Sequence, residues 1–132
     1  LEAELLPGPD APALSRALVS RACQEWGVGR VRRLAELVVS ELASNAVVHA
    51  RTPAVATVRL LDDCLQMAVR DGDPRLVSHP PPGAHGAHHG EHGRGLLILD
   101  AMTDSWGSAP TADGKVVWAQ VRIPRQRTAP PM

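Results

Sequence analysis

Residues 30–50 constrain the fold more than any other part of the chain. This stretch contains no Gly or Pro, and its apolar residues recur at intervals of three and four, which predicts one amphipathic helix. Glu41 and Asn45 lie one turn apart within its apolar arc, and His49 follows one turn later. A carboxylate turned toward a core costs roughly several kcal/mol unless it is paired or kept wet. Two hypotheses follow: a buried hydrogen-bond network, or a functional site.

The remaining segments predict an α+β fold. Strands are expected at 1–6, 54–61, 64–70, 104–108 and 115–123, and helices from Asp10 or Pro12 to Trp26 and at 96–102. The second and third strands are joined by a tight turn, which predicts a hairpin. This order indicates a two-layer sandwich, in which helices cover one face of a mostly antiparallel, mixed sheet.

The length of 132 residues fits a single domain, with residues 75–92 as a flexible lid and 124–132 as a tail. Fourteen basic residues balance fourteen acidic ones, which argues against a general nucleic-acid or membrane binder. Two cysteines are too few for a disulfide framework. No signal peptide or bilayer-spanning run of ~18 apolar residues is visible, so a cytoplasmic location is expected. The chain does not begin with Met, which leaves a longer parent protein as an alternative.

Two further motifs accompany the long helix. Asp71-Gly72 follows a strand, where the carboxylate can accept a hydrogen bond from a ligand, although Asp-Gly is more often only a turn. Gly93-Arg94-Gly95-Leu96 precedes a helix, where glycines let a phosphate approach backbone N–H groups. In the long helix, Asn45 offers a neutral oxygen suited to Mg²⁺. Glu41 is placed to orient or deprotonate a hydroxyl.

The histidines suggest a different hypothesis. Five of them fall within fourteen residues of the expected lid: His79, His85, His88, His89 and His92. Imidazole suits Zn²⁺, Ni²⁺ or Cu²⁺. No cysteine joins them, and the Gly- and Pro-rich spacing offers no fixed scaffold, which favours a solvated, pH-sensitive lid over a metal site. A His-rich metal-binding module is retained as a third hypothesis for the chain.

The order and spacing of the three motifs resemble the GHKL, or Bergerat-fold, ATPases. Residues 40–50 (Ser-Glu-Leu-Ala-Ser-Asn-Ala-Val-Val-His-Ala) resemble the N box SELxxNAxxHA of bacterial anti-sigma-factor serine kinases. Asp71-Gly72 is similar to the G1 box of that family, and residues 93–96 are similar to its G2 box. Gly114-Lys115 with Trp118 also looks like that group. The resemblance extends from about Pro9 to Ile123.

The resemblance implies ATP and Mg²⁺ as cofactors and a role for each motif. Asn45 would hold Mg²⁺ against the ATP phosphates, and His49 belongs to the same nucleotide-binding box. Asp71 would accept the adenine amino group, and Gly72 would let the base lie close. Glu41 would be the general base for transfer to a serine. The phosphates would be cradled by the backbone of Gly93, Arg94, Gly95 and Leu96.

At the level of function, the resemblance implies an anti-sigma-factor kinase. Its partners would be a sigma factor and a STAS-type anti-anti-sigma protein, with a homodimer as an alternative and no direct contact with nucleic acid or membrane. Two departures favour a second hypothesis, a nucleotide-binding switch or adaptor without useful kinase activity. Asp73 stands where the G1 box usually has a second Gly. Val116 is expected in the place of a Thr that supports the adenine-binding Asp.

Overall fold

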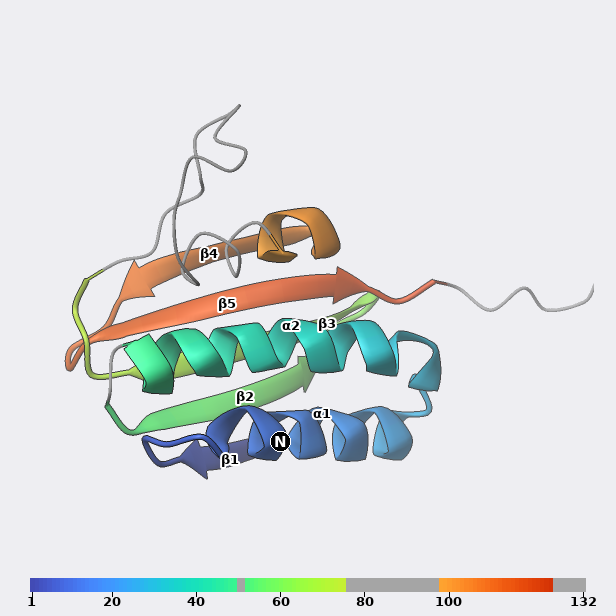
Figure 1. Ribbon diagram of the computed structural model, residues 1–132. Helices are drawn as coiled ribbons and strands as arrows, with labels where there is room; N and C mark the ends of the chain where they lie inside the picture. The colour runs from blue at the N-terminus through green and yellow to red at the C-terminus, as the bar shows by residue number, and fades with distance from the viewer. Residues whose placement is uncertain (50–51, 76–97, 125–132) are drawn as a thin grey trace, which may run out of the picture.

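The computed structural model describes residues 1–49, 52–75 and 98–124 of the chain. Five strands form one sheet: β1 (Glu2–Leu5), β2 (Ala54–Leu60), β3 (Cys64–Asp71), β4 (Ser105–Pro110) and β5 (Lys115–Arg122). Two long helices, α1 (Ala11–Trp26) and α2 (Arg32–Ser44), lie side by side across one face of it (Figure 1). The predicted two-layer α+β sandwich is therefore confirmed.

The sheet has the order β1-β2-β3-β5-β4. Each of its four pairings is antiparallel, so no mixed pairing occurs among the described strands. The predicted edge strand at the start of the chain is present as β1, and β2 and β3 form the predicted hairpin. The crossing from β3 to β5 brings together residues that are distant in sequence, and this pairing positions the site described below.

The helices match the predicted segments except at the ends of α2. Gly27 ends α1 with φ of 65°, a left-handed conformation that suits glycine. A 3₁₀ turn, η1 (Gly29–Val31), precedes α2, and a π-helical turn, η2 (Asn45–His49), continues it. The prediction of one uninterrupted α-helix over residues 30–50 is therefore wrong at both ends. π-helical turns within α-helices occur often at functional sites.

Side chains along β3 and β5 point alternately to a buried face and to an open face of the sheet. On β3 the buried face carries Leu65, Met67, Val69 and Asp71, and on β5 it carries Lys115, Val117, Ala119 and Val121. These apolar side chains pack beneath α1 and α2 in a core that includes Val38, Val39 and Leu42. The same period-two pattern places one carboxylate and one ammonium group at the end of the core, on the helix-covered face.

The described part of the last predicted helix covers residues 98–102, and Leu99 there belongs to the core. Cys23 and Cys64 are free and buried, and burial raises the pKa of both thiols. Within the described ranges, no helix has the combined length and apolar character needed to cross a membrane.

Candidate functional site

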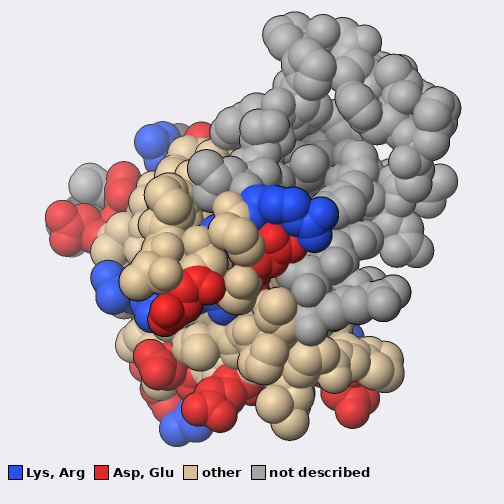
Figure 2. All heavy atoms as spheres, turned by 90° about the vertical axis from the view of Figure 1, so that its left-hand side faces the viewer, with Lys and Arg blue, Asp and Glu red and all other residues tan. Residues whose placement is uncertain are grey.

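The predicted site residues on α2 and β3 that the structure describes lie at one end of the sheet. The end of α2, the end of β3 and the start of β5 all lie at the left-hand edge of the molecule in Figure 1. Figure 2 looks onto this end, where acidic and basic side chains lie next to one another. Elements that carry two of the three predicted motifs therefore lie at the same end of the sheet, while the third motif lies outside the described residues.

Asp71 is the last residue of β3, and its carboxylate is almost fully enclosed. The residue is 4% exposed. Oδ1 accepts hydrogen bonds from the backbone N–H of Asp73 at 2.8 Å and from Nζ of Lys115 at 3.1 Å. The same Nζ lies 3.0 Å from Oδ2 as an ion-pair contact, but Oδ2 accepts no hydrogen bond from the described residues. Asp71 thus has a fixed orientation and one acceptor oxygen without a hydrogen-bond donor.

Lys115, the only lysine in the chain, was not assigned to the site by the sequence motifs. It lies directly opposite Asp71 in the β3–β5 register and is 3% exposed. Its ammonium group also lies 3.4 Å from the backbone carbonyl oxygen of Asp73. The sequence does contain a signal for it, because Lys115 lies two and four residues before Val117 and Ala119 and so shares their buried face of β5.

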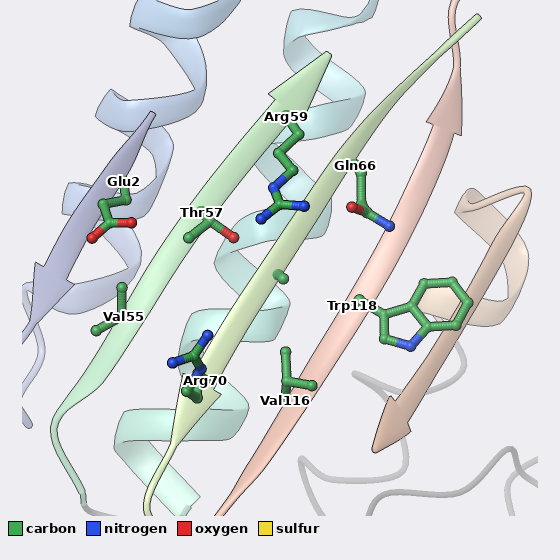
Figure 3. Close-up of a pocket in the computed structure, with 9 residues that line it drawn as sticks. Glu2, Val55, Thr57, Arg59, Gln66, Arg70, Val116 and Trp118 are labelled. Carbon is green, nitrogen blue, oxygen red and sulfur yellow. The ribbon is translucent and has the colours of Figure 1, made fainter. Parts of the chain in front are cut away.

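Val116 does not lie beside Asp71, contrary to the expectation that it replaces a supporting Thr. It pairs with Arg70 and faces the open side of the sheet. There it lines a hollow of about 390 Å³ together with Arg59, Arg70 and Trp118 (Figure 3). Because neighbouring residues of a strand point to opposite faces, Lys115 rather than Val116 contacts the carboxylate.

The close approach of β5 to β3 depends on Gly114. A Cβ at this position would lie 2.1 Å from the carbonyl oxygen of Asp71, which is far inside van der Waals contact. At Gly72 a Cβ would meet only the Thr52 side chain, at an ordinary 3.6 Å. The backbone N–H of Gly72 donates to Thr52 Oγ1 at 3.1 Å. The protein packing therefore requires glycine at 114 but not at 72.

Asp73 does not present an unpaired charge, because Arg75 binds its carboxylate. Nη2 of Arg75 lies 2.8 Å from Oδ2, and the backbone N–H of Arg75 donates to Oδ1 at 2.9 Å. The side-chain hydrogen bond from Arg75, followed by the backbone one, holds the pKa of Asp73 well below its usual range. The acidic residue that stands in place of the second Gly of the G1 box is therefore neutralised by its own neighbour.

Glu41 and Asn45 lie at the end of α2, where this helix passes into η2. Both residues are half-buried, and η2 contacts β3. Glu41 makes no ion pair with the other described residues. The amide Nδ2 of Asn45 is buried and has no hydrogen-bond partner among them. His49 ends η2, and its side chain lies outside what the structure describes.

Three buried polar atoms among the described residues lack hydrogen-bond partners: Asn45 Nδ2, Asp71 Oδ2 and Thr111 Oγ1. Asp71 and Thr111 lie at the same end of the sheet, since β5 pairs there with both β3 and β4. Buried polar groups are normally satisfied, so such a group indicates a missing ligand or water. The Nδ2 of Asn45 is a donor and so indicates a missing acceptor, whereas the oxygen of the same amide is the atom that could hold Mg²⁺, an ion that takes few protein ligands.

An apolar hollow of about 480 Å³ lies beside the Asp71 turn. Its walls include Leu5, Leu6 and Pro53, and its rim includes Asp71 and Gly72. Apolar walls with a few polar groups are typical of pockets for small organic ligands, a purine base among them.

Several predicted features lie outside the described residues. These are the phosphate-binding residues Gly93, Arg94, Gly95 and Leu96, the lid from residue 76 onward and the five lid histidines. In the described part of the chain, no group of three or more His, Cys, Asp or Glu side chains is arranged to hold a metal ion.

Comparison with known proteins assigns the chain to a family. No curated protein matches the chain. The family model described as "Histidine kinase-like ATPase domain" matches residues 8–121, which is most of the chain and includes Glu41, Asn45, Asp71 and Lys115. The chain therefore belongs to the family of histidine kinase-like ATPase domains, and it is an ATP-binding regulatory domain of that family.

Proposed function

We propose that this chain is a Mg-ATP-dependent protein serine kinase that acts as an anti-sigma factor. It would bind a sigma factor and phosphorylate a serine of a STAS-type anti-anti-sigma protein, and phosphorylation would control which partner it holds. The observation that carries this proposal is the placement of Glu41 and Asn45 on one helix end, with the Asp71 acceptor at the neighbouring strand end.

Three of the described residues, Asp71, Asn45 and Glu41, would act in binding and transfer. Asp71 would accept the adenine amino group through Oδ2, the oxygen that takes no hydrogen bond from the described residues. Asn45 would hold Mg²⁺, which neutralises negative charge on the phosphates when bound. Glu41 has no ion-pair partner among the described residues and would take the proton from the serine hydroxyl. The serine oxygen would attack the γ-phosphorus while the bond from that phosphorus to the bridging oxygen breaks and ADP leaves. Phosphoryl transfer depends mainly on positioning and charge neutralisation, so these few groups can suffice.

The alternative is a nucleotide-binding switch or adaptor without useful kinase activity. The enclosure of Asp71, 4% exposed and paired with Lys115, does not separate it from the kinase, because both hypotheses require nucleotide binding. The two arguments for it from the sequence carry little weight, since Arg75 pairs with Asp73 and Val116 lies on the opposite face.

The test is transfer of labelled γ-phosphate from ATP to STAS-domain proteins of the same genome. The kinase hypothesis predicts labelling of at least one of them on serine, and Glu41→Ala should reduce the rate about 10²- to 10⁴-fold, as expected for loss of a general base. ATP binding should persist in this variant. Turnover that is unchanged in Glu41→Ala would remove Glu41 from the mechanism. Binding of ATP without transfer to any STAS protein would favour the adaptor.

A further inference from the structure

We propose that Lys115 is the positioning residue for base recognition: it orients the Asp71 carboxylate so that Oδ2 can accept a hydrogen bond from the 6-amino group of a purine. This inference rests on the proposed nucleotide-binding function and adds to it a residue that the three motifs do not contain.

The hydrogen bonds of the carboxylate leave one place for a ligand. An ionised carboxylate can accept about four hydrogen bonds, two on each oxygen. Oδ1 is already used by the Asp73 N–H at 2.8 Å and by Lys115 Nζ at 3.1 Å. Oδ2 has the 3.0 Å ion-pair contact with Lys115 but no hydrogen bond among the described residues. Oδ2 therefore keeps an open acceptor position, and an exocyclic amino group is a donor that can fill it.

The type of residue at 115 also supports a specific role. The chain has fourteen basic residues, and Lys115 is its one lysine. Its side chain is 4% exposed and that of Asp71 is 1% exposed. An ammonium group is a compact point charge, whereas a guanidinium is a planar fork with five donors. A lysine places one compact charge within reach of both oxygens of Asp71 and of the carbonyl of Asp73.

The backbone around Lys115 holds the pair in register. Asp71 and Lys115 are directly opposed in the β3–β5 ladder, next to the close approach at Gly114. The Asp73 backbone completes the arrangement, because its N–H donates to Asp71 and its carbonyl lies near the ammonium. Because the carboxylate is fixed before a base arrives, its side chain loses little conformational entropy on binding. This is the physical basis of preorganisation.

The experiment compares ATP with purine riboside triphosphate, which lacks only the 6-amino group. Binding of both is measured by calorimetry on the wild type, on Lys115→Met and on the control Arg59→Met. Arg59 is an exposed cation on the open face of β2 and has no contact with Asp71. Lys115→Met should weaken ATP about tenfold or more while leaving purine riboside triphosphate nearly unchanged, because only the former uses Asp71. Arg59→Met should bind both like the wild type.

A second measurement needs no substitution. Protein labelled with ¹⁵N-lysine gives a single side-chain ammonium resonance, because the chain contains one lysine. ATP should shift this resonance clearly more than purine riboside triphosphate does. This measurement decides the question if Lys115→Met does not fold.

The outcomes separate the two proposals. Equal weakening of both nucleotides by Lys115→Met, unchanged ATP preference in that variant, or equal shifts of the ammonium resonance would each overturn the role of Lys115 while leaving the proposed function intact. Failure of the wild type to bind either nucleotide would contradict the proposed function itself, and this inference with it.

Discussion

The two halves of the candidate site differ in whether the protein supplies hydrogen-bond partners for their buried polar groups. At the end of β3, the Asp71 carboxylate is held by Lys115 and by the backbone of Asp73. At the end of α2, the buried amide nitrogen of Asn45 has no partner among the described residues. The end of β3 is thus held in place by the protein itself, whereas the end of α2 carries a buried donor that an acceptor on a ligand would satisfy.

Because of this difference, removing a polar group should lower the free energy of unfolding in one half of the site and raise it in the other. A buried ion pair becomes strongly unfavourable when one partner is removed, because the other charge is left uncompensated. A buried donor without an acceptor costs about 1–3 kcal/mol, so removing it can stabilise the fold. Substitutions in the two halves should therefore change the free energy of unfolding in opposite directions.

Removal of the ammonium group should have the largest effect. Lys115→Met leaves the Asp71 carboxylate buried and unpaired, and the free energy of unfolding should fall by about 3–5 kcal/mol. The double variant Asp71→Asn with Lys115→Met has neither charge and should regain most of that loss. Urea unfolding followed by circular dichroism measures both. A loss below ~1 kcal/mol in the single variant, or no recovery in the double one, would mean that the pair is not buried as described.

A methyl group at position 114 should have the next largest effect. Gly114→Ala places a Cβ against the Asp71 carbonyl oxygen, so β3 and β5 must separate, at a cost of about 1–3 kcal/mol. The matched control is Gly72→Ala, which should change stability by no more than ~0.5 kcal/mol, because its Cβ meets only Thr52 at 3.6 Å. The same urea titrations compare them. Equal losses in the two variants would contradict the special packing at Gly114.

Removal of the unbonded amide should be mildly stabilising. Asn45→Leu replaces a buried donor with an apolar group of similar size, and the ligand-free protein should gain about 1 kcal/mol. The variant should at the same time lose its response to Mg-ATP, an exchange of function for stability that is common at binding sites. A clear loss of stability would show instead that the amide makes a favourable contact.

The smallest effect concerns the ion pair of Asp73 with the exposed side chain of Arg75, which follows the end of β3. Arg75 lowers the pKa of Asp73, so the stabilisation is present above the usual Asp pKa of about 3.9 and is lost as pH falls through the lower native value. The stability difference between wild type and Arg75→Met should be small at pH 7 and should shrink below about pH 4. Denaturant titrations at several pH values test this, and a difference that grows in acid would have the wrong sign.

Local patterns in the sequence predicted the order of helices and strands, because periods of two and of three to four residues depend only on near neighbours. The pairing of Asp71 with Lys115 depends on the β3–β5 register between residues 44 positions apart. A slip of one residue would have placed Val116 on the Asp71 face, and nothing local excludes it. The π-helical turn at Asn45 was missed for a similar reason, since it continues the same apolar pattern as the α-helix before it.

Thermal unfolding with and without Mg-ATP, on the wild type and on Asn45→Ala, tests most directly whether this end of the sheet binds nucleotide. A ligand that binds only the folded state adds ~2.7 kcal/mol at a hundredfold excess over its dissociation constant, which corresponds to several degrees in a domain of this size. We expect the wild type to show that rise only when Mg²⁺ is present, and Asn45→Ala to lose it. No rise in the wild type at millimolar ATP, or an equal rise in both proteins, would contradict the proposed site.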